Sequence, residues 1–173
     1  MTTCQDAGMI ENSVTAASKG IFMPHSFVPI GTVRGSRQES VEDNWGSVEC
    51  RIEFDPEELE ADATLGLGDY SHIEVVFLFH RIDRVCRGTQ HPRGNPSWSR
   101  TGILAQRAPN RPNHLGVTIC ELLAVDGLTL SVRGLDALDG SPVLDVKPCL
   151  PEFAPRGEVR VPRWSTELMS HYF

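Results

Sequence analysis

One segment constrains the fold of this chain more than any other. Residues 117–125 and 128–133 are two runs rich in β-branched and aliphatic side chains, and they flank the dipeptide Asp126-Gly127. Asp-Gly is preferred in the two-residue type I′ turn, whose twist matches that of two antiparallel strands. The segment therefore predicts a β-hairpin and favours an antiparallel sheet.

Further strands are predicted on both sides of this hairpin. Residues 47–54 alternate polar and apolar side chains, which is typical of a half-buried strand. Residues 71–80 are rich in β-branched and aromatic side chains and predict a central strand. Shorter strands are expected at 27–34, 101–106 and 142–147.

Helix is expected to be minor. Asp55-Pro56-Glu57-Glu58 combines an N-cap residue, a proline at the first helical position and acids in the first turn, so it predicts a short helix ending near Gly66 or Gly68. A terminal helical turn is expected within 164–173. Because strands and helices do not alternate, a parallel doubly wound sheet is disfavoured. We predict an all-β fold with minor helix, a single-domain antiparallel β-barrel of six to seven strands, with a sandwich as the alternative.

The domain organisation follows from length and local composition. A chain of 173 residues is the size of one domain. We expect a flexible N-terminal arm over 1–25, the barrel domain over 26–155 and a C-terminal tail over 156–173. The longest uncharged apolar run, near 75–79, is too short to cross a membrane. The N-terminus lacks a basic start and an apolar stretch, so no signal peptide and a cytoplasmic location are expected.

The charge distribution suggests a local anion site. Asp and Glu outnumber Lys and Arg by 23 to 16, which argues against a protein whose whole surface binds nucleic acid. Arg residues nevertheless concentrate between Arg81 and Arg111, where Asp83 is the single acid. Arg is suited to bidentate contacts with carboxylate and phosphate. A coding bias that replaces Lys by Arg is the alternative explanation of the Arg content.

No metal site is predicted. The five Cys are widely spaced without a C-x-x-C pair, and the six His show no tight ligand spacing. The candidate functional residues lie instead in irregular segments, where sites on a β scaffold usually occur. Pro109 and Pro112 stiffen the turn that carries Arg107 and Arg111, although two surface arginines in a proline-rich turn are the simpler reading.

Each of three further features has both a structural and a functional interpretation. His80 and Arg81 end an apolar strand, so His80 is either a satisfied structural residue or a group that titrates near neutral pH. Asp136 and Asp139 lie in a Gly-containing turn, where Asp is common for conformational reasons alone. Trp45, in an acidic loop, is either a core anchor or a stacking surface for a base.

A family resemblance emerges from longer strings. They are PIGTVRG (29–35), GLGDYSHIEVVFLFHR (66–81), HPRGNP (91–96), RTGILAQRAPNRPNHLGVTICEL (100–122) and LDALDGSPVLDVKPCLPEF (135–153). Together they resemble the TsaA/TrmO family, also called uncharacterised family 0066. The resemblance implies an S-adenosylmethionine-dependent methyltransferase on an antiparallel barrel, usually dimeric, that methylates N6 of threonylcarbamoyladenosine 37 in tRNA. It implies no membrane partner and no bound metal ion.

The resemblance also implies site residues. The cofactor-binding positions would be Asp43, Asn44, Trp45, His80, Arg81, Arg107, Leu115, Asp136, Ala137, Leu138 and Asp139. We expect Arg107 to bind the cofactor carboxylate, and Asp136 and Asp139 to bind ribose hydroxyls or the amino group. Arg111, Asn113 and Lys147 are candidates for substrate contacts. The catalytic base is unassigned, with His80 and Asp136 as candidates.

The chain departs from the family pattern in places. It reads Asp43-Asn44-Trp45 where the bacterial tRNA enzymes typically have P-R-Q, and Cys149 where Tyr is usual. Those enzymes also carry an additional C-terminal domain. These departures leave open a second hypothesis, a non-catalytic barrel that binds S-adenosylmethionine or RNA as a sensor or adaptor.

Overall fold

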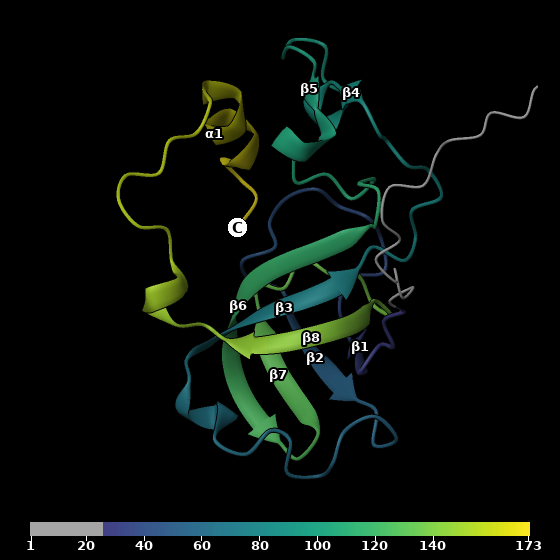
Figure 1. Ribbon diagram of the computed structural model, residues 1–173, viewed down its shortest axis with the longest axis vertical. Coiled ribbons are helices and arrows are strands. Elements are labelled where there is room, and N and C mark those ends of the chain that lie inside the picture. The colour runs from purple at the N-terminus through teal and green to yellow at the C-terminus, as the bar shows by residue number, and fades with distance from the viewer. Residues whose placement is uncertain (1–25) are drawn as a thin grey trace, which may run out of the picture.

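The centre of the protein is a closed barrel of six antiparallel strands (Figure 1). The computed structural model describes residues 26–173, so the arm predicted for 1–25 lies outside the described residues. The order around the barrel is β1 (Gly31–Arg34), β2 (Glu49–Phe54), β7 (Thr129–Arg133), β6 (Leu115–Asp126), β3 (His72–Leu78) and β8 (Pro142–Pro148), and β8 pairs back to β1. The predicted all-β antiparallel barrel is confirmed, and closure of the sheet excludes the open sandwich.

The predicted hairpin is also confirmed. β6 and β7 pair up to Asp126 and Thr129 around the Asp126-Gly127 turn, and Gly127 has a φ of 54°, which an Asp-Gly turn of this type requires. β6 is the longest strand and pairs with β3 along its first half and with β7 along its second. The register shifts between Leu122 and Ala124, an irregularity that bends β6 where it passes from one partner to the other.

The core fills the barrel with the inward-facing residues of each strand. β2 contributes Cys50, Ile52 and Phe54, and β3 contributes Ile73, Val75 and Phe77, alternating with exposed or half-buried neighbours. The other buried core members are Val33, Cys120, Leu122, Leu130, Val132, Leu135, Ala137 and Val143. The period-2 pattern read from the sequence is therefore the pattern that separates core from surface.

Several short elements lie outside the barrel. β4 (Thr89–Gln90) pairs with β5 (Thr101–Gly102), and a C-terminal helix, α1 (Arg163–Met169), confirms the predicted helical turn. The 3-10 turns are η1 (Leu67–Asp69), η2 (Pro92–Gly94), η3 (Ile103–Ala105) and η4 (Pro151–Phe153). Figure 1 shows β4, β5 and α1 beyond the same end of the barrel. None of the helices among residues 26–173 is long and apolar enough to span a membrane.

Three local predictions need correction. The helix expected from Asp55 is absent. Its cap forms, since Asp55 Oδ1 accepts the Glu57 N–H at 2.9 Å, but in the acidic segment that follows only Leu59 and Leu67 pack against the core, and the chain folds as turns and η1. Strand 27–34 is reduced to β1 because residues 26–29 are exposed. Strand 101–106 stops after Gly102 and continues as η3.

We expect Gly116→Ala to destabilise the barrel. A Cβ on Gly116 would lie 2.4 to 2.7 Å from three carbons of the Phe77 ring, which is fully buried and has no room to move. Overpacking of this kind costs about 1–3 kcal/mol of unfolding free energy, measurable by urea denaturation. Gly102→Ala is the control, because its Cβ would meet nothing within 4 Å. Equal stability of the two variants would contradict this account.

Candidate functional site

The principal cavity lies at the end of the barrel where β3 ends and β6 begins. It has a volume of about 1150 Å³, which is large enough for a nucleoside-sized ligand. Its walls come from segments far apart in the sequence: the loop after β1, the end of β3, the loop between β5 and β6, the turn before β8, and the chain that follows α1. Polar and charged side chains from these segments converge on one space.

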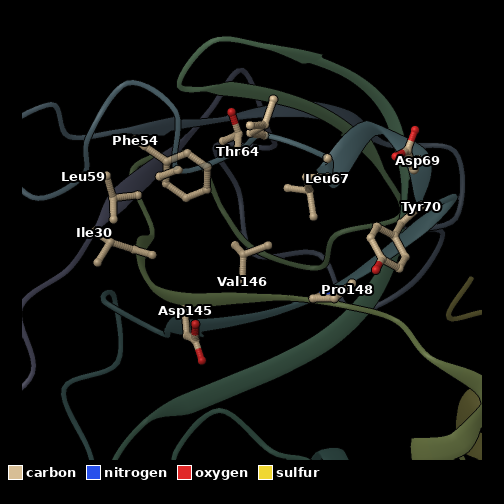
Figure 2. Close-up of a pocket in the computed structure, with 13 residues that line it drawn as sticks. Ile30, Phe54, Leu59, Thr64, Leu67, Asp69, Tyr70, Asp145, Val146 and Pro148 are labelled. Atoms are coloured by element: carbon tan, nitrogen blue, oxygen red, sulfur yellow. The ribbon is translucent and has the colours of Figure 1, made fainter.

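A second hollow, of about 650 Å³, opens at the opposite end of the barrel. Figure 2 shows its apolar lining, with Ile30, Phe54, Leu67 and Val146 around the hollow and Tyr70 beside Pro148. Its polar lining residues are Thr64, Asp69, Tyr70 and Asp145, so its charges are acidic and, among the described residues, neither Arg, Lys nor His lines it. Lys147, a predicted substrate contact, is next to this lining, exposed and paired with Asp145, and does not reach the principal cavity.

Asp136 is an acidic group of the principal cavity that is held at both carboxylate oxygens. Its neighbours in the chain, Leu135 and Ala137, are buried in the core and fix the backbone. Thr118 Oγ1 donates a hydrogen bond to Asp136 Oδ1, and Tyr172 Oη donates one to Asp136 Oδ2. Burial, followed by the charge of Asp136, raises the pKa of Tyr172 well above its usual range, so this phenol acts as a donor.

His80 and Arg81 form a second group. His80 Nδ1 lies 3.2 Å from Ser141 Oγ, and His80 Nε2 accepts a hydrogen bond from Arg81 Nε at 3.2 Å. Arg81 also donates to the backbone oxygens of Gln38 and Asp139. Burial, and next the charge of Arg81, lower the pKa of His80 against the opposing effect of Asp139. His80 is therefore a neutral imidazole near pH 7.

We expect the pKa of His80 to rise when Arg81 is replaced by glutamine. The guanidinium disfavours the imidazolium, so its removal leaves burial as the main cause that still lowers the pKa. A pH titration of the imidazole C–H resonances by NMR measures the change. Arg51→Gln, on the exposed outer face of β2, is the control. A pKa of His80 that is the same in both variants would show that Arg81 has no such influence.

The proline-rich turn 107–116 is fixed by a cluster of amides. Asn110 Nδ2 donates to Gln90 Oε1 at 2.8 Å, and Gln106 Nε2 donates to Thr101 Oγ1 at 2.8 Å. These bonds join the turn to β4 and β5. Arg107 and Arg111 both line the cavity, but each also donates to backbone oxygens, Arg107 to Val117 and Arg111 to Gln106.

The acidic loop after β1 is held from outside the barrel. Arg93 makes two hydrogen bonds to the Asp43 carboxylate, at 2.7 and 3.2 Å, and lies 3.2 Å from Glu42 Oε2. Trp45 is only 4% exposed, and the Arg37 guanidinium lies 4.7 Å from its ring centroid. Of the two interpretations of Trp45, the anchor is the one that its burial supports.

Sequence reasoning missed the part of the wall formed by the end of α1 and the residues after it. Leu168, Met169, Tyr172 and Phe173 line the cavity, although no motif in the tail pointed to it. Thr118 was also missed, although a signal for it exists: it is a polar residue at an inward-facing position among apolar ones on β6. Arg93, in the Arg-rich segment, was not singled out either.

The predicted site residues divide into two sets. Those that line the principal cavity are Trp45, His80, Arg81, Arg107, Arg111, Asn113, Leu115, Asp136 and Leu138. Those that do not line it are Asp43, Asn44, Ala137, Asp139 and Lys147, of which Ala137 is in the core and Asp139 contacts Arg81 through its backbone oxygen. Among residues 26–173, no group of three or more His, Cys, Asp or Glu side chains is arranged to hold a metal ion.

Comparison with known proteins decides the family. A family model described as the tRNA-methyltransferase O N-terminal domain matches residues 37–154. The chain belongs to this family. The tRNA-methyltransferase O N-terminal domain thus spans most of the barrel and the turn that carries Arg107, while α1 and the residues after it lie outside the matched range. The resemblance noted in the sequence is confirmed.

Relatives of this domain family differ in how much of their length the chain spans. A probable S-adenosyl-L-methionine-binding protein of Methanothermobacter thermautotrophicus is 43% identical over 125 residues, which are 69% of this chain and 86% of the relative. The tRNA (adenine(37)-N6)-methyltransferase of Escherichia coli is 38% identical over 97 residues, 53% of this chain and 41% of that enzyme. The human protein of the same name is 37% identical, with only 20% of its length covered.

A solved structure agrees with the barrel. The crystal structure of TrmO from Pseudomonas aeruginosa superposes with a TM-score of 0.64 at 29% identity, over 80% of this chain and 62% of that one. The chain therefore spans less than two thirds of that structure and less than half of the Escherichia coli enzyme.

Proposed function

We propose that this protein is a methyltransferase that binds S-adenosylmethionine in the principal cavity and acts on N6 of a modified adenosine, threonylcarbamoyladenosine 37, in tRNA. The observation that carries the proposal is the convergence of Asp136, Arg107 and His80 on one cavity in a chain of this family. The names of its relatives, S-adenosyl-L-methionine-binding protein and tRNA (adenine(37)-N6)-methyltransferase, support the choice of cofactor and substrate.

The residues present fit this cofactor. When bound, S-adenosylmethionine supplies a methyl group on a positively charged sulfur, an electrophile that needs little further activation. Arg107, which lines the cavity with donors to spare, is suited to the cofactor carboxylate. The Asp136 carboxylate is suited to ribose hydroxyls or the amino group. Leu115 and Leu138 supply apolar wall against which a purine ring can pack.

His80 is the candidate we favour for accepting the proton that the nucleophilic nitrogen loses. It lines the cavity, and its lowered pKa keeps the imidazole neutral and able to accept a proton. Its Nε2 already accepts a hydrogen bond from Arg81 Nε. This role therefore requires Arg81 to turn away when substrate binds, and Asp136 remains the other candidate.

We further propose that the segment between β3 and β5 contacts the tRNA backbone. Arg84 and Arg87 are exposed, and within the part of the chain that the structure describes they make neither a hydrogen bond nor an ion pair with another residue. Such side chains are free to contact phosphates, and binding through them weakens with added salt. Trp45 is too buried to stack on a base, so Trp98, which is half-buried near α1, is the better candidate.

A homodimer and a cytoplasmic location complete the proposal. Leu115, Ile119 and Leu123 are exposed at every fourth residue on the outer face of β6, and Leu104 is 78% exposed. Leu104, Leu115 and Ile119 also line the principal cavity, so a second copy seated on this surface would border the cofactor site. An exposed apolar stripe of this kind is typical of a surface covered by another protein copy. Sedimentation velocity tests the dimer: a monomer at all concentrations, with Ile119→Asp indistinguishable from the wild type, would contradict it.

The function is tested by separating binding from transfer. Isothermal titration calorimetry with S-adenosylmethionine measures binding, and transfer of labelled methyl to tRNA from a strain that lacks this modification measures turnover. The proposal expects both. Binding without transfer to any RNA would support the non-catalytic sensor or adaptor instead. Absence of S-adenosylmethionine binding would contradict both the methyltransferase and a sensor of this cofactor.

We expect Arg107→Ala to weaken the binding of S-adenosylmethionine by about 1–3 kcal/mol, or roughly 5- to 150-fold in Kd, because charge-assisted hydrogen bonds to the cofactor carboxylate are lost. Calorimetry measures the change. Arg51→Ala, an exposed arginine on β2 away from the cavity, is the control. Wild-type affinity in the Arg107 variant would refute the role given to this side chain.

A further inference from the structure

Tyr172, which follows α1, lines the principal cavity and lies outside the residues that the family model matches. We propose that Tyr172 is a positioning residue: its hydroxyl fixes the Asp136 carboxylate in the orientation that receives S-adenosylmethionine. This inference rests on the proposed function and deepens it. It assigns a role in cofactor binding to the C-terminal segment 163–173, which the barrel motifs do not include.

The segment is attached to the cavity wall by its backbone. The Asn44 N–H donates to the His171 oxygen at 2.8 Å, and the Trp45 N–H donates to the Tyr172 oxygen at 2.7 Å. The approach is close, because a Cβ on Gly46 would lie 2.8 Å from the carbonyl carbon of Phe173. α1 is tied down as well, since Trp98 Nε1 donates to Glu167 Oε2 at 3.1 Å. The position of Tyr172 is thus set by several independent contacts.

The ring of Tyr172 is held from two sides. The Arg93 guanidinium lies 5.8 Å from its centroid, and Phe173 packs against it edge to face at 4.9 Å. Arg93 is fixed in turn by its ion pair with Asp43 at 2.7 Å. The phenol is therefore presented to Asp136 by a supported side chain rather than by a free one.

Two donors then determine the orientation of the carboxylate. Thr118 bonds one oxygen of Asp136 and Tyr172 bonds the other, so the carboxylate plane is fixed by a donor at each oxygen. Each oxygen can still accept a second hydrogen bond, and a cavity of about 1150 Å³ remains with Tyr172 in place. Tyr172 therefore leaves room for the cofactor, and a carboxylate oriented before binding loses less conformational entropy when the cofactor arrives.

The chain offers a matched pair of variants, because it contains two tyrosines. Tyr172→Phe removes the hydroxyl and keeps the ring, and Tyr70→Phe makes the same change at the opposite end of the barrel. We expect calorimetry to show Kd for S-adenosylmethionine raised about 3- to 10-fold in Tyr172→Phe and unchanged in Tyr70→Phe. Where transfer is measured, KM should rise more than kcat falls.

A double-mutant cycle with Asp136→Asn separates positioning from a general structural effect. Because Tyr172 acts through Asp136, we expect Tyr172→Phe to change Kd much less in the Asp136→Asn background. Three results would overturn the inference and leave the proposed function intact. They are additive effects of the two substitutions, an unchanged Kd in Tyr172→Phe, and tighter binding by Tyr172→Phe. Tighter binding would mean that Tyr172 competes with the cofactor. Failure of the wild type and Tyr70→Phe to bind would overturn both.

Discussion

Replacing Asp136 by alanine is expected to weaken the binding of S-adenosylmethionine by about 10- to 150-fold. A hydrogen bond to a charged group contributes about 1.5–3 kcal/mol, and we expect this carboxylate to make at least one with the cofactor. The change also leaves the hydroxyls of Thr118 and Tyr172 without their acceptor. Thr118 is only 6% exposed, so its unsatisfied hydroxyl adds a loss of about 1–3 kcal/mol in unfolding free energy.

The measurements are calorimetry with S-adenosylmethionine and urea denaturation of the same variant. Asp145→Ala is the matched control, since Asp145 is also an aspartate of the barrel, in β8, but it pairs with Lys147 and does not line the principal cavity. If the Asp136→Ala protein binds the cofactor as tightly as the control does, Asp136 does not contribute to the cofactor site.

Phe77→Ala is expected to lower the free energy of unfolding by about 3–5 kcal/mol, the usual cost of deleting a buried aromatic ring. Phe77 is fully buried and is one of the largest fully buried side chains. Its ring packs edge to face on Phe79 at 5.1 Å between centroids, and it fills the space that Gly116 leaves open on β6.

Urea denaturation of the wild type and the variant measures this effect. Leu65→Ala, at a side chain that is 88% exposed, is the control and should change stability by less than about 0.5 kcal/mol. Because Phe79 lines the principal cavity, we also expect cofactor binding to weaken in Phe77→Ala and not in Leu65→Ala. A loss of stability below about 1 kcal/mol would show that the barrel interior relaxes around the missing ring.

The barrel could be predicted from sequence because several of its strands alternate buried and outward-facing residues. In β2 and β3 every second residue is buried, and in the β6–β7 hairpin the Asp-Gly pair marks the turn. The helix expected from Asp55 failed for a physical reason. A good cap is a local signal, but a helix also needs an apolar face to bury, and the acidic residues after Asp55 do not supply one.

The candidate site was predictable only in part. Arg107, Arg111, His80 and Asp136 stood out because of residue type and turn context, and they do share one cavity. Their partners depend on contacts between distant segments, such as Arg81 with the Gln38 backbone and Tyr172 with Asp136. No local pattern encodes such a pairing. Tyr172 in particular comes just after α1 and belongs to no sequence motif, so nothing near it in the chain indicates where it lies.

Closure of the six strands limits how another molecule can attach to the main sheet. An open sheet exposes a row of amide and carbonyl groups at its margin, and another molecule can extend it by adding a strand. Here β8 returns to β1, so the main sheet has no such margin. Any association through this sheet would therefore have to use side-chain surfaces, such as the one that exposes Ile119, and the closed sheet is a poor template for fibril growth.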